Sequence, residues 1–113
     1  MNNRIEIEPR HREIVAAILH RHVPRREVWV FGSRATGQSR PYSDLDLAIG
    51  GDIPLSLAIL AALSEDFENS LLPFKVDVVD CATAPDSFRQ IIAPTRILLQ
   101  KPEFDEGAVA EAL

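Results

Sequence analysis

Apolar residues recur at helical spacing in three segments of the chain. In residues 9–22, PRHREIVAAILHRH, they fall on one face, which predicts a helix from about Pro9 to His22 that Pro24 stops. A second stripe after Pro54 predicts a helix with Leu55, Ala58, Ile59, Ala62, Leu63 and Phe67 on its apolar side. A third helix is expected to open at Pro85 and to end or kink at Pro94.

Short runs of β-branched and apolar residues lie between these helices. Glu27–Phe31, Asp44–Ile49 and Lys75–Asp80 predict three strands, the first two of which end at glycine. Residues 97–99, Ile-Leu-Leu, are too few to distinguish helix from strand. The order α-β-β-α-β-α indicates an α/β (α+β) fold, a small mixed sheet with helices packed on it.

Length and composition indicate one domain over residues 1–113, with a core at about 10–100 and an acidic tail at 102–113. No apolar run approaches the roughly 20 residues that span a bilayer. The N-terminus has no signal-peptide core, so we expect no targeting segment. The single cysteine, Cys81, fits a reducing compartment, which favours the cytoplasm.

Charge is divided unevenly along the chain. The net charge is −5, yet residues 1–40 hold eight Arg against four Glu, and the remainder holds four bases against thirteen acids. An acidic protein is poorly suited to the nucleic-acid backbone. The asymmetry is either random or it gives the N-terminal part a surface for an acidic partner or substrate.

The segment FGSRATGQSRPYSDLDLAIG, residues 31–50, carries the candidate chemistry. Gly32 and Gly37 have the spacing of a P-loop, but Gln38 stands where its lysine would be and a strand follows. No Gly-x-Gly-x-x-Gly occurs. Both common nucleotide-binding motifs therefore fail.

Two carboxylates, Asp44 and Asp46, alternate with buried-type leucines and share one face of their strand. Asp77 lies mid-strand among valines, where an unpaired charge is costly. Carboxylates of this kind bind Mg²⁺, and two such ions can clamp the attacking and leaving oxygens of a phosphoryl transfer. The alternatives are a solvated Asp-x-Asp face and an Asp77 paired with an arginine.

A phosphate cradle precedes the acids. Gly32 allows close backbone approach, the Ser33 hydroxyl can bind phosphate oxygens, and Arg34 offers a fork suited to phosphate. Gly32-Ser33 is otherwise an ordinary turn that ends a strand.

Gly32-Ser33, ten residues, then Asp44-Leu45-Asp46, with Asp77 on a later strand, resembles the signature of the DNA polymerase beta nucleotidyltransferase superfamily. Over residues 10–100 the chain is most similar to its minimal nucleotidyltransferase (MNT) proteins. The resemblance implies the nucleotidyltransferase fold, ATP as the substrate and two bound Mg²⁺ ions. It also implies that Gly32 and Ser33 contact the β- and γ-phosphates, that Asp44, Asp46 and Asp77 bind metal, and that Asp77 helps to take the acceptor's proton.

The resemblance implies a partner as well. MNT proteins of this kind act as antitoxins. They pair with a HEPN-domain toxin and transfer AMP to one of its tyrosines. Two alternatives stay open, namely adenylylation of a small-molecule hydroxyl and neutralisation of the partner by binding alone. The absence of a recognisable second substrate domain disfavours the former, and the presence of all three acids disfavours the latter.

The remaining candidates have ordinary interpretations. His11, His20 and His22 show no metal-ligand spacing, Cys81 has no nearby histidine, and Trp29 is expected in the core. Ser43 is expected to support Asp44. Tyr42 is either a packing residue or a stacking surface for a base.

Overall fold

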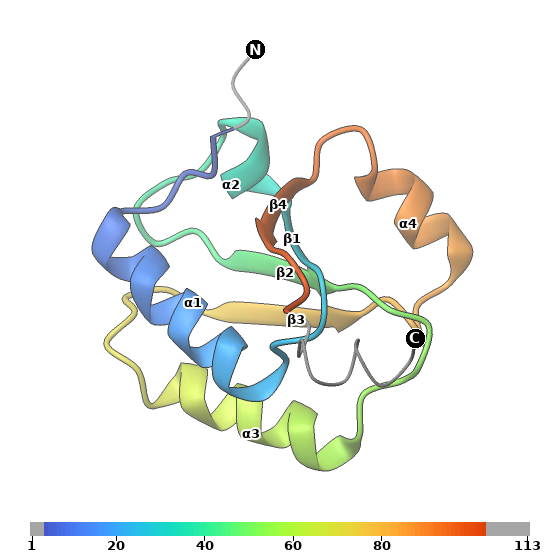
Figure 1. Cartoon of the computed structure of the whole chain (residues 1–113). Coiled ribbons are helices and arrows are strands. Elements are labelled where there is room, and N and C mark those ends of the chain that lie inside the picture. The colour runs from blue at the N-terminus through green and yellow to red at the C-terminus, as the bar shows by residue number, and fades with distance from the viewer. Residues whose placement is uncertain (1–3, 104–113) are drawn as a thin grey trace.

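The computed structural model describes residues 4–103, so most of the predicted tail, 104–113, lies outside the described residues. The elements are α1 (Pro9–His22), β1 (Val28–Phe31), α2 (Ser33–Thr36), β2 (Leu45–Ile49), α3 (Leu57–Glu68), β3 (Val76–Asp80), α4 (Asp86–Ile92) and β4 (Ile97–Gln100). The sheet order is β3-β2-β1-β4 (Figure 1). The α/β (α+β) fold class, a mixed sheet with packed helices, is confirmed.

The sheet is mixed because one pair of strands is parallel. β1 runs antiparallel to both β2 and β4, whereas β2 and β3 are parallel. Parallel neighbours need a crossover connection, and α3 provides it. Two strands separated by 26 residues of sequence therefore start at the same end of the sheet.

Two apolar layers enclose the sheet. The larger core packs α1 and α3 on one face, around fully buried residues of the two central strands: Val28, Val30, Leu45, Leu47 and Ile49. A smaller cluster lies under α4 on the other face, where Ala48, Cys81 and Ile92 contact Trp29, Phe31 and Phe88. The expectation that Leu45 and Leu47 point into the core is confirmed. Trp29 is only half-buried and belongs to the smaller cluster.

Two elements were not in the predicted order. The helix α2 is a single turn of four residues, too short to show an amphipathic period. The undecided run at 97–99 is strand β4, and its pairing with β1, not its composition, makes it one. The second helix begins at Leu57 rather than Pro54, because the Ser56 hydroxyl caps it by accepting from the Ile59 amide at 3.1 Å.

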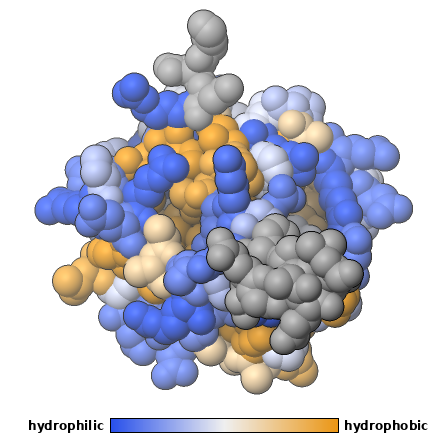
Figure 2. Space-filling model, in the orientation of Figure 1, coloured by the Kyte–Doolittle hydropathy of each residue, from blue (hydrophilic) through white to orange (hydrophobic). Residues whose placement is uncertain are grey.

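Hydrophilic side chains make up most of the face shown in Figure 2, with smaller apolar patches between them. The large apolar side chains that are most exposed, Tyr42, Ile53, Leu57, Leu71 and Ile91, come from separate loops and helices. No helix within residues 4–103 is long and apolar enough to cross a membrane.

Candidate active site

The turn after β1 has a conformation that requires glycine. Gly32 has φ 75° and ψ −155°, and Ser33 then starts α2. A Cβ atom placed on Gly32 would lie 2.3 Å from Oδ2 of Asp46. The acid of β2 therefore rests against the bare backbone of this turn.

The three predicted acids come to the same edge of the sheet. Asp46 and Asp77 are register partners across the parallel pair β2–β3, and Asp46 is also paired with Phe31 of β1. Because Leu45 and Leu47 face the large core, Asp46 faces the α4 side of the sheet. Asp44 lies one residue before β2 and is exposed.

Burial and mutual repulsion act on the central carboxyl. The pKa of Asp46 is raised, first by burial and then by the negative charges of Asp77 and Asp44. A carboxylate whose charge is disfavoured by two neighbouring carboxylates favours a nearby cation.

The structure places Lys75 at this edge, a residue that the sequence analysis missed. Its ammonium lies 3.2 Å from Oδ1 of Asp77. The pKa of Lys75 is raised by its hydrogen bond with Asp77, by the charge of Asp77 and by that of Asp44. The sequence could have indicated this position, because Lys75 lies two residues before Asp77 and such residues share a face of a strand.

The donor set fits a hard divalent cation in its chemistry, although the side chains are not arranged around one. Within residues 4–103, no three Asp, Glu, His or Cys side chains form a group that could hold a metal ion as they stand. Asp44 is exposed and the Asp77 side chain is 41% exposed, so both are free to change rotamer. Carboxylate oxygens with open solvent positions are what Mg²⁺ uses.

The proposed phosphate contact of Arg34 does not fit this structure. Arg34 is 5% exposed, and all three of its guanidinium nitrogens donate to backbone carbonyls. The acceptors are Glu6, Arg40, Pro41 and Ser43, at 2.7–3.4 Å. The guanidinium also stacks on Phe74, 4.2 Å from the ring centre. Arg34 therefore fastens the loop that leads to Asp44 instead of facing a ligand.

A comparison with known protein families shows to which family a chain with this turn and these acids belongs. The family model described as "Polymerase beta, Nucleotidyltransferase" matches residues 7–104. This chain belongs to the polymerase beta nucleotidyltransferase family. Both the Gly32-Ser33 turn and the three acids lie inside the matched residues.

Individual members of the family agree with this assignment. The chain is 41% identical over 99 residues to the probable protein adenylyltransferase MntA of Haemophilus influenzae, covering 88% of this chain and 87% of that protein. A minimal nucleotidyltransferase structure shares 33% identity and a TM-score of 0.58, over 78% of this chain and 88% of that one.

Two similar structures are complexes. A toxin–antitoxin with AMP-PNP has a TM-score of 0.67 at 22% identity, over 89% of this chain and 82% of that one. An AMPylated HEPN toxin of Shewanella oneidensis in complex with its MNT antitoxin gives 0.62 at 20% identity, over 94% and 79%. At these identities they establish the nucleotidyltransferase fold.

The loop before Asp44 is ordered by its own hydrogen bonds. The Ser43 hydroxyl accepts from the Arg40 amide at 2.8 Å, and the Glu6 carboxylate accepts from the amide and the hydroxyl of Ser39. Ser43 thus orders the loop that leads to Asp44. Tyr42 is 76% exposed, so it is not a core residue, and its role toward a base stays a prediction.

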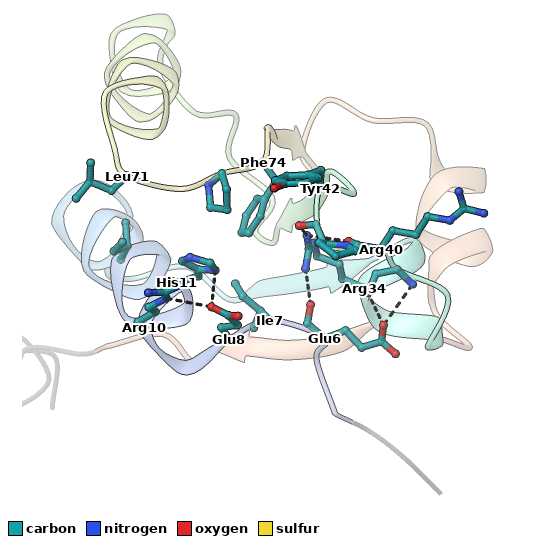
Figure 3. A pocket seen from close by; sticks show the side chains of 14 residues that line it. Glu6, Ile7, Glu8, Arg10, His11, Arg34, Arg40, Tyr42, Leu71 and Phe74 are labelled. Atoms are coloured by element: carbon teal, nitrogen blue, oxygen red, sulfur yellow. Dashed lines mark hydrogen bonds and ion pairs between the residues drawn. The ribbon is translucent and has the colours of Figure 1, made fainter.

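A hollow of about 810 Å³ lies beside this loop, but it is separate from the acids. Figure 3 shows its walls, where Tyr42 and Phe74 stand opposite Ile7 and His11. Phe74 packs edge-on against His11, and Ile14 of α1 also lines the hollow. It therefore opens on the α1 side of the sheet, whereas Asp46 faces the α4 side.

Two histidines of α1 pair with carboxylates, and Cys81 is buried. His22 bonds to Asp66 at 2.6 Å, His20 contacts Glu103, and neither belongs to a metal-binding group within the part of the chain described. Cys81 is buried, and burial raises the pKa of its thiol. A protonated, covered thiol is a poor nucleophile.

Proposed function

We propose that this nucleotidyltransferase is a Mg²⁺-dependent protein adenylyltransferase that transfers AMP from ATP to a tyrosine hydroxyl of a HEPN-type toxin and thereby acts as its antitoxin. The observation that carries the proposal is the paired placement of Asp46 and Asp77 beside the Gly32–Ser33 turn. The 41% identity to MntA supports AMP transfer to a protein. The fold shared with antitoxin complexes supports the partner class.

Every predicted site residue except Arg34 has a proposed role in this reaction. Asp44, Asp46 and Asp77 would hold Mg²⁺, which when bound neutralises the phosphates and the developing charge. Gly32 and Ser33 would contact the β- and γ-phosphates, and the bare backbone of Gly32 places this turn against Asp46, one of the acids that would hold Mg²⁺. Asp77 is accessible enough to receive the proton of the incoming hydroxyl.

The bond changes are those of an in-line substitution. The acceptor oxygen bonds to the α-phosphorus of ATP, the bond from that phosphorus to the bridging oxygen breaks, and pyrophosphate leaves. The acceptor proton passes to the Asp77 carboxylate. The product is a phosphodiester whose negative charge on the toxin opposes binding of RNA phosphates.

The chain's other properties agree with such an enzyme. We propose that residues 1–113 act as one minimal nucleotidyltransferase domain, because α1, α3 and the sheet share one core. A cytoplasmic location would supply ATP and keep the buried thiol of Cys81 reduced.

Intact mass spectrometry of the protein encoded beside this one tests the proposal, after incubation with this chain, ATP and Mg²⁺. The partner should gain one or more AMP units, and Asp44→Ala should abolish the gain. Asp52→Ala is the matched control, since the Asp52 side chain is 97% exposed and outside the site. A stable complex without any mass gain would contradict the enzyme and favour neutralisation by binding. Modification of a small-molecule hydroxyl but not of the protein would contradict the partner.

A further inference from the structure

Lys75 is held at the acid cluster by both its backbone and its side chain. Its carbonyl accepts from the amide of Leu45 at 2.9 Å, the residue between Asp44 and Asp46. Its ammonium lies 3.2 Å from Oδ1 of Asp77. The strand pairing that brings the acids together therefore also fixes the backbone of Lys75 beside them.

The Lys75 ammonium contacts Asp77 although its side chain could extend into water. The Lys75 side chain is 73% exposed, and a long lysine side chain at such a position is free to extend into water. It points instead at the half-exposed carboxylate of Asp77, and Asp44 acts on the same ammonium electrostatically. The nearby Arg34 cannot serve in its place, because its guanidinium nitrogens donate to backbone carbonyls.

We propose that Lys75 is the resident counter-ion of this acid cluster, through Asp77 and Asp44, and that a divalent cation displaces it. The inference rests on the metal role proposed for Asp44, Asp46 and Asp77. The ammonium offsets part of the negative charge at Asp77 and Asp44, and it lies against a carboxylate that would hold the metal. Two cations at one carboxylate repel each other, so the ammonium would move away from a bound metal. Lys75 thereby lowers the affinity of the nucleotide-free site for metal.

The chain is well suited to a test, because Lys75 and Lys101 are its only lysines. Lys75 precedes β3 and Lys101 follows β4, and these are the two outer strands on opposite sides of the sheet. A side-chain NMR spectrum of protein labelled at lysine contains one ε-methylene signal for each. Titration with Mg²⁺ alone should shift the Lys75 signal and leave that of Lys101 in place. Asp77→Asn, which removes the contact, should move the Lys75 signal in the same direction without metal.

Affinity gives a second measurement, on uniformly ¹⁵N-labelled wild type and variants. The backbone amide of Gly32 reports Mg²⁺ binding, because this turn lies against Asp46. Lys75→Met should tighten Mg²⁺ binding about fivefold, in line with the loss of one partly screened charge contact. Lys101→Met removes the same charge elsewhere and should change affinity little. Lys75→Arg should behave as the wild type.

The outcomes separate the two proposals. If Mg²⁺ moves the Gly32 amide while the Lys75 signal and the Lys75→Met affinity stay unchanged, the counter-ion role is wrong and the metal site stands. If Mg²⁺ moves neither signal, or if Asp44→Ala with Asp46→Ala leaves the response intact, the metal site itself is wrong and the counter-ion role fails with it.

Discussion

Gly32 and Asp46 are in contact in a way that no other residue type at position 32 permits. A Cβ on Gly32 would meet the Asp46 carboxylate at 2.3 Å, and its φ of 75° is unfavourable for any side chain. The Gly32–Ser33 turn and Asp46 of β2 are thus fitted to each other. A substitution at position 32 changes both the backbone and the position of the carboxylate.

Gly32→Ala should abolish AMP transfer and lower the free energy of unfolding by about 2 kcal/mol. Denaturant unfolding and the mass assay measure the two effects. Gly37→Ala is the matched control, because Gly37 also has a positive φ of 79°, while its added Cβ would meet only the end of the Glu6 side chain at 3.3 Å. That variant should lose stability but keep AMP transfer, and equal loss of activity in both would contradict a special role for the Gly32–Asp46 contact.

Arg34 should prove to be a structural residue. Arg34→Met leaves the partly buried carbonyls of Glu6 and Ser43 without their donor, so the free energy of unfolding should fall by about 2–4 kcal/mol. Arg34→Lys should recover only part of it, since one ammonium cannot reach carbonyls on both sides. Urea unfolding measures this. A variant of normal stability with a raised KM for ATP would instead restore the phosphate contact predicted from the sequence.

Asp46→Asn should separate stability from activity. Removing one of three mutually repelling charges should leave the free energy of unfolding in metal-free buffer unchanged or slightly higher. AMP transfer should fall by about a hundredfold or more. Thermal unfolding with a chelator and the mass assay test both. A marked loss of stability would show that the Asp46 carboxylate is a structural group. Asp80 is an acid of that kind, because its carboxylate accepts hydrogen bonds from the amides of Leu55 and Ala82.

Acid should weaken the contact between α1 and α3. Asp66 of α3 accepts from His22 at 2.6 Å and from Arg21 at 2.9 Å, and the hydrogen bond from His22 is the main reason that the pKa of Asp66 is lowered. A lowered folded-state pKa stabilises the fold above the usual value of about 3.9, and this is lost as pH falls through the lower value. The stability difference between wild type and Asp66→Asn should therefore shrink as pH falls below about 4. A difference that persists in acid would contradict this origin.

Local pattern was sufficient for most of the fold. The first helix, Pro9–His22, has its predicted bounds because apolar spacing and two prolines act within the segment itself. The three predicted strands each lie within one residue of their expected starts. By contrast, α2 is too short to carry a period, and β4 is a strand because β1 pairs with it.

By itself the sequence determined that Gly32-Ser33 ends one strand and that Asp44 and Asp46 begin the next, because covalent connection and the alternation of side chains fix those relationships locally. It also marked Asp77 as an acid among valines. Only the tertiary structure decided that Asp77 lies opposite Asp46, that Lys75 faces Asp77 and that Arg34 is committed to backbone carbonyls. Those facts depend on which distant segments pack together, and residue spacing along one segment carries no information on that.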